Sequence, residues 1–267
     1  MVLPYPVPRA MNETPHAAIR AYYDALCSAW GRQHWWPAQS RFEVIVGAYL
    51  TQNTAWTNVE KALGNLRQER LLTIDGIRRT PKRRLERLIR PSGYFRQKAQ
   101  RLKTFVRFLD ARYGGSLARM FARPTAELRE ELLALNGVGP ETADSILLYA
   151  GNHPVFVVDA YTRRILERHQ IVSTAVGYDE IRLLFERALG ETPSSPGPPM
   201  QSLDGAPSGP PGSCHRPSRM SKASRTASVQ VFNEMHGLIV GVGKNYCLKS
   251  QPQCEQCPLQ KFLPEAK

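Results

Sequence analysis

The sequence predicts an all-α protein, and three observations support this class. Apolar residues recur at a spacing close to 3.6 in nearly every segment of the chain. Only one run has the character of a strand, residues 155–158, and it has no second strand to pair with. Of the 267 residues, 42% are hydrophobic and 22% are charged. This composition is typical of a folded protein with a sizeable core.

The expected helices follow this period in order along the chain. Ile19, Tyr22 and Leu26 mark the apolar face of the first. Thr80 and Pro81 have the character of an N-cap and a first-turn proline. The expected helices run over residues 16–30, 42–50, 59–66, 126–135, 141–149, 160–169, 178–189 and 229–242. Another follows Thr80-Pro81 and ends at Pro91, and a long one contains Ala99 and Leu109 and ends at Gly114.

Residues 191–228 differ in composition from the rest of the chain. More than half of them are Pro, Gly or Ser, and their only large apolar residues are Met200, Leu203 and Met220. Such a segment buries too little apolar surface to offset the entropy of ordering. We therefore expect a disordered insertion over 191–228.

The charge of the chain bears on its partners. There are 36 Lys and Arg residues against 23 Asp and Glu, a net charge of +13. Residues 76–103 hold eleven of the basic residues and one acid, Glu86. A solvated helical face has this pattern too, but a cluster spanning a turn and two helices favours a surface that faces phosphates. No apolar run is long enough for a membrane helix and the N-terminus has no secretory signal, so we expect a cytoplasmic protein acting at the nucleoid.

The segment LNGVGPETA, residues 135–143, lies between two expected helices. Gly137 and Gly139 on either side of Val138 permit a tight turn that opens the next helix, where backbone N–H groups favour an anion. An ordinary turn between two helices also uses glycine. Asp159 follows 20 residues after Gly139 and precedes another helix, a position typical of a capping aspartate and suited to stabilising a cation.

LNGVGPETADSILLYAGNHPVFVVDAYTRRIL resembles the helix-hairpin-helix, Gly/Pro-Asp motif of the endonuclease III superfamily of DNA glycosylases. QHWWPAQSRFEVIVGAYLTQNTAWTNVEKAL, RPSGYFRQKAQRLK and FNEMHGLIVGVGKNYC make the chain most similar to its 3-methyladenine glycosylase branch. The resemblance implies a six-helix barrel over 38–151. It also implies a second helical domain, from 12–37 and 152–267, that carries a C-terminal cysteine cluster.

The resemblance also assigns residues. Asp159 matches the catalytic aspartate, and Gly137, Val138 and Gly139 match the phosphate-binding hairpin. Where bifunctional members carry a nucleophilic lysine, this chain has Glu141, which favours a glycosylase without strand cleavage.

Further residues are expected in the base pocket and on the DNA. The resemblance implies that Trp36 and Trp56, with Trp35, stack on the extruded base, although core packing is the more common role of a single tryptophan. The further expected DNA contacts are Gln52, Asn53 and Lys98. The resemblance implies that an amide fills the gap left by the base, and both Gln52 and Asn53 remain open for this role.

Cys247, Cys254 and Cys257 form a C-x6-C-x2-C pattern. In the superfamily this spacing belongs to a [4Fe–4S] cluster, but the fourth ligand position here is Leu263. The pattern favours a cluster over zinc, and zinc over no metal.

These features together predict a monomeric base-excision glycosylase that acts on damaged bases in double-stranded DNA. An alkylated purine such as 3-methyladenine is the expected lesion. The alternatives are a glycosylase for oxidised pyrimidines or mismatches, and a non-catalytic module that binds damaged DNA.

Overall fold

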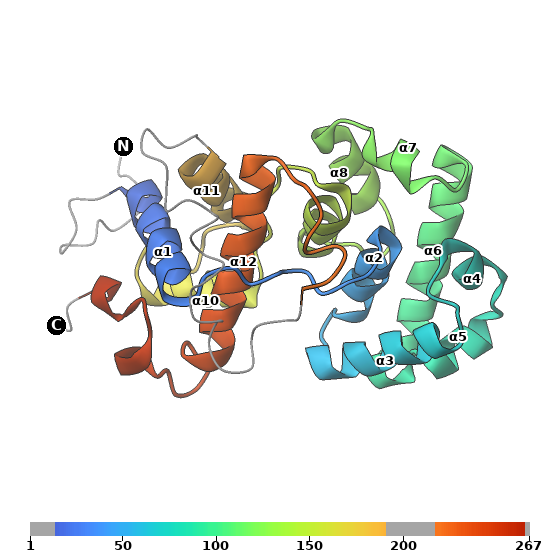
Figure 1. Ribbon diagram of the computed structural model, residues 1–267, viewed down its shortest axis with the longest axis horizontal. Coiled ribbons are helices and arrows are strands. Elements are labelled where there is room, and N and C mark those ends of the chain that lie inside the picture. Colours follow the sequence, from blue (N-terminus) through green and yellow to red (C-terminus); the bar gives the residue numbers. More distant parts are fainter. Residues whose placement is uncertain (1–13, 191–216, 265–267) are drawn as a thin grey trace. The chain divides into compact units, whose positions relative to one another are not determined.

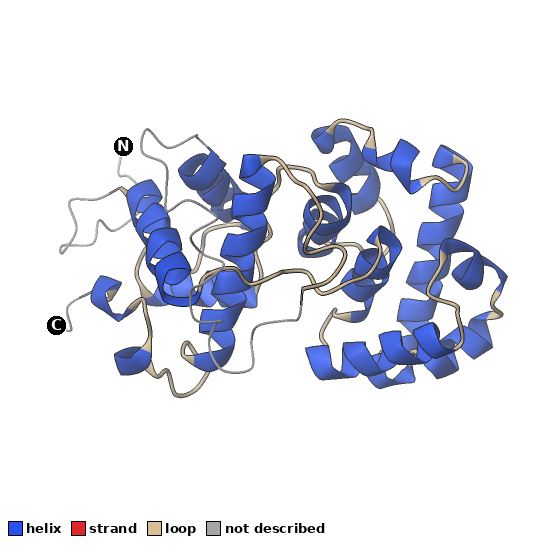
Figure 2. Ribbon diagram, in the orientation of Figure 1, coloured by secondary structure: helices blue, strands red, loops and turns tan. Residues whose placement is uncertain are grey.

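The computed structural model describes residues 14–190 and 217–264, and every regular element in these ranges is a helix (Figures 1 and 2). The predicted all-α class is therefore confirmed. Residues 155–158, the one run with the character of a strand, belong to no regular element within the described ranges. None of the helices described is long and apolar enough to cross a bilayer.

The chain divides into two compact units. The middle unit is Ala38–His153, and the terminal unit combines Met1–Pro37 with Pro154–Lys267. The middle unit holds α2 (Arg41–Leu50), α3 (Trp56–Gln68), α4 (Ile74–Arg79), α5 (Lys82–Leu88), η1 (Arg90–Ser92), α6 (Phe95–Tyr113), α7 (Leu117–Phe121), α8 (Thr125–Leu133), α9 (Pro140–Ser145) and the π-helical turn η2 (Ile146–Gly151). The terminal unit holds α1 (Pro15–Trp30), α10 (Ala160–Arg168), α11 (Tyr178–Gly190), α12 (Ala227–Asn245), η4 (Cys254–Gln256) and η5 (Gln260–Phe262).

Helix α2 is the core of the middle unit. Every residue from Phe42 to Leu50 is buried, and the helix packs against α3, α6, α9 and η2. Ser40 caps its first turn by accepting a hydrogen bond from the backbone N–H of Glu43. Because α2 is buried from Phe42 to its last residue, Leu50, the loop that follows it with Gln52 and Asn53 starts from the core of the unit.

Helix α12 has the corresponding place in the terminal unit, where it packs against α1, α10 and α11. Thirteen of its residues are buried. Gly237 lets the segment before Pro37 approach closely, because a Cβ atom there would lie 3.1 Å from both Gln33 and Trp35. Glu234 fixes the same segment by accepting a hydrogen bond from the backbone N–H of Gln33 at 2.8 Å.

The structure corrects the C-terminal boundary of the expected insertion 191–228. Residues 217–228 are described, and α12 already begins at Ala227. Ser218 and Met220 are buried, and the Ser218 hydroxyl donates to the carbonyl oxygen of Trp36 at 3.3 Å. The Pro, Gly and Ser content of the segment gave no indication that Ser218 and Met220 are buried. The rest of the expected insertion, residues 191–216, lies outside the described ranges.

The structure also moves one helix start. Thr80 ends α4 and does not cap the next helix, and α5 begins at Lys82 after Pro81. Helices α4 and α7 were absent from the sequence-based expectation because each is short, with six and five residues.

Candidate active site

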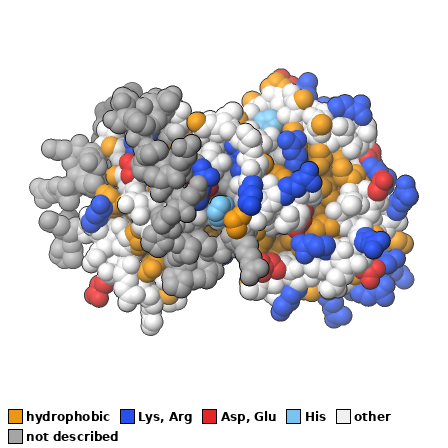
Figure 3. Space-filling model, in the orientation of Figure 1, with side chains coloured by type: hydrophobic (Ala, Val, Ile, Leu, Met, Phe, Trp, Pro, Cys, Tyr) orange, Lys and Arg blue, Asp and Glu red, His pale blue; other side chains and the backbone are white. Residues whose placement is uncertain are grey.

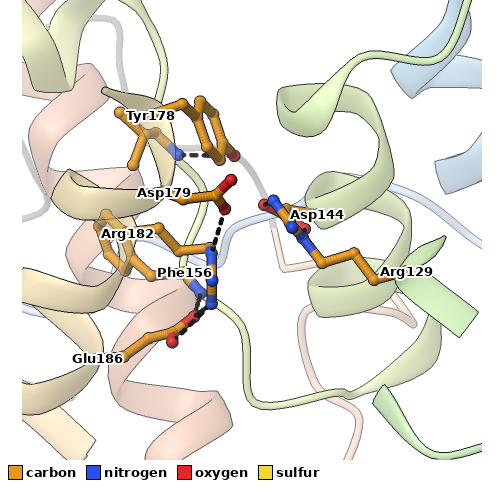
Figure 4. A network of polar contacts seen from close by, with 8 residues as sticks. Arg129, Asp144, Phe156, Tyr178, Asp179, Arg182 and Glu186 are labelled. Carbon is orange, nitrogen blue, oxygen red and sulfur yellow. Dashed lines mark hydrogen bonds and ion pairs between the residues drawn. The ribbon is translucent and has the colours of Figure 1, made fainter. Parts of the chain in front are cut away.

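The segment that contains Phe156 and leads to Asp159 is held in place by side chains of α11 (Figure 4). The backbone N–H of Phe156 donates to Glu186 at 2.9 Å, and that of Val158 donates to the Tyr178 hydroxyl at 3.3 Å. The Phe156 ring stacks on Phe185 with 4.1 Å between centroids. A segment with no strand partner is thus fixed by side chains that satisfy its buried donors.

A second layer of contacts holds Glu186 itself. Arg182 donates to both of its carboxylate oxygens, at 2.9 and 2.8 Å, and also to Asp179 at 3.0 Å (Figure 4). The network therefore runs from the surface of α11 to the backbone that leads to Asp159. This supports a fixed position for the Asp159 carboxylate.

The two carboxylate oxygens of Asp159 have different surroundings. Oδ1 accepts from the backbone N–H of Thr162 at 2.7 Å and from its hydroxyl at 2.9 Å, which makes Asp159 the N-cap of α10. Oδ2 lies 3.6 Å from Nε2 of His236, a residue of α12. The Asp159 side chain is 13% exposed. One carboxylate oxygen therefore caps α10, and the other faces the imidazole of His236.

The hairpin between α8 and α9 has the geometry expected of its two glycines. Gly137 has a φ of +78°, and a Cβ atom there would lie 2.0 Å from Nε of Arg101. Gly139 has nothing within 4 Å of a Cβ atom, so its outer side is open. The side chain of Val138 is buried. The turn thus presents backbone to the outside while Val138 anchors it inside.

Gln52 connects the C-terminal end of α2 to this hairpin. Its Nε2 donates to the Gly137 carbonyl oxygen at 3.0 Å and to the Thr142 hydroxyl at 2.9 Å. Its Oε1 accepts from Arg101 at 2.6 Å. The Gln52 amide is therefore committed to holding the hairpin, whereas Asn53 beside it is exposed with a φ of +51°.

A buried ion pair joins the two helices of the hairpin. Arg129 of α8 donates to both carboxylate oxygens of Asp144 in α9, at 2.7 and 3.2 Å (Figure 4). Asp144 is completely buried. Sequence reasoning missed this pair and the roles of Gln52 and Arg101, because none of these residues has a distinctive local pattern.

The structure changes the role expected of Lys98. The side chain is 1% exposed, and its ammonium donates to the carbonyl oxygens of Leu50 and Ser92 and to the Thr54 hydroxyl, each at 2.7 Å. Burial, followed by the charge of Arg101, lowers the pKa of Lys98 to about 8. Three internal acceptors occupy its three donors, so Lys98 is an internal brace and not a surface contact.

Lys98 braces two turns that carry exposed side chains. Thr54 belongs to the loop of Asn53, and Ser92 precedes Tyr94. Tyr94 is 66% exposed with a φ of +43° and was not among the residues expected from the sequence. Only the structure reveals the exposure of this large aromatic side chain.

Basic side chains surround these turns. Of the eleven Lys and Arg residues in 76–103, eight are exposed, and Figure 3 shows basic side chains distributed over the middle unit. Some are paired with acids, such as Arg84 with Glu69 at 2.6 Å and Arg78 with Asp110 at 2.6 Å. The exposed basic residues are Arg78, Arg79, Lys82, Arg83, Arg84, Arg87, Arg90 and Arg96.

The expected aromatic residues differ in exposure. Trp35 and Trp36 are 8% and 5% exposed, with their rings edge to face at 5.5 Å. Trp35 also lies 6.0 Å from the ring of His236. Trp56 begins α3 in the middle unit, is partly exposed, and donates from its indole N–H to Glu60 at 2.8 Å.

Cys247, Cys254 and Cys257 line one small cavity with Leu263, the residue at the expected fourth ligand position. Arg168 donates to the Cys247 sulfur at 3.2 Å, and burial raises the pKa of the Cys257 thiol. Within the described ranges no three His, Cys, Asp or Glu residues are placed to hold a metal ion, and Cys214 lies outside those ranges. Three thiols and a leucine do not fit a four-thiolate cluster.

Arginines of α10 hold this cysteine loop. Arg168 donates to the carbonyl oxygens of Leu248 and Lys249 at 2.6 and 2.9 Å. Arg164 donates to the carbonyl oxygens of Cys247 and Gly243 at 2.7 and 3.0 Å. The loop is therefore fixed by hydrogen bonds from within the chain.

Comparison with known proteins identifies relatives along nearly the whole chain. A candidate DNA repair glycosylase of Methanocaldococcus jannaschii is 38% identical over 254 residues, covering 94% of this chain and 98% of its own length. Endonuclease III of Thermotoga maritima is 26% identical and covers 82% of this chain and 80% of its own.

Solved structures share the fold. The 3-methyladenine DNA glycosylase MagIII of H. pylori, bound to 1,N6-ethenoadenine, has a TM-score of 0.65 and 27% identity, with 87% of this chain and 98% of that chain covered. An endonuclease III–DNA covalent intermediate has a TM-score of 0.66 at 21% identity, with 92% and 94% covered. The model of the HhH-GPD superfamily of base excision DNA repair proteins matches residues 46–191. This chain belongs to the HhH-GPD superfamily of base excision DNA repair proteins.

Proposed function

We propose that this protein is a monofunctional DNA glycosylase that removes alkylated purines, with 3-methyladenine as the representative substrate. Glu141 carries the proposal. It lies in the first turn of α9, directly after the hairpin. The resemblance to the endonuclease III superfamily places the lysine nucleophile of strand-cleaving members at this position. A carboxylate cannot form the Schiff base through which such a lysine breaks the DNA strand. Lys98 is buried and its ammonium is bonded to three internal acceptors.

The chemistry then rests on Asp159. An N-alkylated purine carries positive charge and leaves readily once the nucleotide is out of the stack, where extrusion costs roughly a few kcal/mol. As the glycosidic bond breaks, the sugar becomes an oxocarbenium-like cation. The Asp159 carboxylate stabilises this cation and guides the water that attacks C1′. Its Oδ2 is the atom for both tasks, because Oδ1 is committed to Thr162.

Backbone and exposed side chains of the middle unit hold the DNA in this proposal. The N–H groups around Gly137, Val138 and Gly139 bind a phosphate, and Gly139 has open space beside it. Asn53 fills the gap left by the extruded base, since it is exposed while Gln52 is engaged by the hairpin. Tyr94 lies on the neighbouring braced turn and adds an apolar contact.

Aromatic stacking selects the base. Trp56 is the partly exposed candidate, and its electron-rich indole face attracts a cationic purine. Trp35 and Trp36 lie in the same unit as Asp159, where Trp35 contacts His236. The H. pylori 3-methyladenine glycosylase, 27% identical and bound to 1,N6-ethenoadenine, supports an alkylated purine as substrate class. The protein would act as a monomer on chromosomal DNA.

Release of free base tests the proposal. Duplexes carrying an alkylated purine, thymine glycol or a G·T mismatch are incubated with the protein, then analysed with and without alkali. We expect base release from the alkylated duplex alone, with strand breaks only after alkali. Release from thymine glycol or G·T would favour the oxidised-pyrimidine or mismatch alternative, and binding without any release would favour the non-catalytic module.

Asp159→Asn tests the role of the carboxylate in the same assay. The amide still accepts the α10 capping bond, so the variant should fold and bind a duplex with an abasic site. Base release should fall by at least about a hundredfold, within the range seen when one electrostatic group is lost. Near-normal release by Asp159→Asn would overturn the mechanism.

A further inference from the structure

His236 combines three features that the proposed chemistry has not used. It is 4% exposed, its Nε2 faces Asp159 Oδ2 at 3.6 Å, and it projects from α12, a different helix from the one that Asp159 caps. The distance lies within ion-pair range but is slightly longer than a good hydrogen bond. A shift of roughly half an ångström would bring Nε2 to hydrogen-bond distance.

The surroundings of His236 limit how its ring can move. The ring lies 6.0 Å from Trp35 and 6.3 Å from Phe156, measured between centroids. Phe156 is itself stacked on Phe185. Trp35 is kept against α12 by the close approach at Gly237. The imidazole is thus packed between rings on two segments, and one of these segments leads directly to Asp159.

The protonation of His236 suits a donor role. Burial lowers the pKa of His236, and the negative charge of Asp159 opposes this effect. A pKa below the usual range leaves the imidazole neutral at neutral pH, with one N–H donor. Tyr161 also lies near Asp159, and its pKa is raised by burial and, to a smaller degree, by the Asp159 charge. The guanidinium of Arg164 lies 5.1 Å from the Tyr161 ring.

We infer that His236 is a positioning residue that directs Oδ2 of Asp159 toward the reacting sugar. This inference rests on the proposed function, because it assigns the chemistry to Asp159. Thr162 holds one carboxylate oxygen from α10. In the inferred arrangement a small shift lets Nε2 of His236 donate to the other oxygen from α12, so that rotation about the Cβ–Cγ bond of Asp159 is restricted. A carboxylate fixed in this way needs no reorganisation when positive charge develops on the sugar. Because His236 is buried, it acts through Asp159 and does not touch the DNA.

Three substitutions at one position separate this role from packing. In His236→Gln, the side-chain amide nitrogen reaches roughly as far as Nε2 of histidine. His236→Asn keeps a side-chain amide but is one methylene shorter than glutamine. His236→Leu replaces the imidazole by an apolar side chain of similar volume. His169→Gln is the control, because His169 is another buried histidine of the terminal unit, bonded to Tyr22 and not to Asp159.

The measurements are the single-turnover rate of base release from methylated duplex DNA at saturating protein, and the Kd for a duplex carrying an abasic-site analogue. We expect the base-release rate of His236→Leu and His236→Asn to be ten- to a hundredfold below that of wild type. The rate of His236→Gln should be higher than theirs, by at least about a third of the logarithm of that loss. The Kd of all three should stay within about threefold, and His169→Gln should keep the wild-type rate.

Several outcomes would overturn the inference. Rates within twofold of wild type for His236→Leu would show that Oδ2 needs no support. Equal rates for the Gln and Asn variants would show that packing alone matters. If His236→Leu does not fold, the comparison of Gln with Asn still decides. Wild type and Asp159→Asn are measured alongside: an inactive wild type would overturn the proposed function and the inference with it, whereas an active wild type confines a failure to His236.

Discussion

The Gln52 amide and the Gly137 carbonyl oxygen, 85 positions apart, are joined by a hydrogen bond of 3.0 Å. The same nitrogen donates to Thr142, so one side chain spans the hairpin from its turn to the first helical turn of α9. We predict that Gln52→Ala destabilises the protein by about 1–3 kcal/mol, because the Gly137 carbonyl and Arg101 lose a partner in a partly buried site. Its affinity for duplex DNA should fall by about tenfold, since the hairpin is then less well ordered.

Urea unfolding and DNA titration measure these two effects. Gln68→Ala removes an exposed glutamine of the same unit and should change neither quantity. Wild-type DNA affinity in a clearly destabilised Gln52→Ala variant would show that the hairpin keeps its geometry without this bond.

Sequence reasoning was most successful where the information is local. The helical period gave the all-α class, and the glycines of the hairpin and the cap at Asp159 follow from nearby residues alone. The contacts between Gln52 and Gly137 and between Asp159 and His236 join residues 85 and 77 positions apart, so no local pattern reveals them. The burial of Lys98 was not foreseen, because a run of basic residues does not show which side chain turns inward.

Lys98→Met tests the internal brace. Methionine keeps the length and apolar stem of lysine but removes the donors to Leu50, Thr54 and Ser92. We expect a loss of stability of about 2–4 kcal/mol, because buried acceptors remain without a partner. DNA binding should weaken, yet the slope of log Kd against log salt should stay at the wild-type value, since no phosphate contact is removed.

Lys61→Met is the matched control for Lys98→Met. Lys61 is an exposed lysine of α3 in the same unit, and its replacement removes one charge without affecting the brace. Its stability should remain at the wild-type value. A salt slope reduced by about one in Lys98→Met, with stability unchanged, would instead indicate a direct phosphate contact.

Leu263→Cys tests the cysteine loop. Because Leu263 lines the same cavity as the three cysteines, a thiol there would complete a four-cysteine set with the superfamily spacing. We expect wild-type protein purified anaerobically to contain no stoichiometric iron. Leu263→Cys should gain iron and an absorption band at about 400 nm after reconstitution.

Leu263→Ser is the control, because serine has a similar size to cysteine but no thiolate. This variant should gain neither iron nor the absorption band. Stoichiometric iron in the wild type would show that a ligand outside the described residues completes the site.

Acid should destabilise the protein through His169. Its Nδ1 lies 2.9 Å from the Tyr22 hydroxyl, and burial, opposed by a hydrogen bond to the Phe262 backbone, lowers its pKa from 6.5 to about 4. Between these values the unfolded chain binds a proton that the folded protein does not. The contribution of His169 to the free energy of unfolding is therefore present above pH 6.5 and is lost as the pH falls toward 4. Between pH 7 and pH 4.5 the loss is about 2–3 kcal/mol. Burial also lowers the pKa of His153 and His236, so their effects have the same sign.

Urea unfolding at pH 7 and pH 4.5 should give a smaller pH-dependent loss of stability in His169→Phe than in wild type. Tyr22→Phe keeps the buried histidine and should retain most of that loss, whereas equal pH dependence in wild type and His169→Phe would show that other groups control acid unfolding.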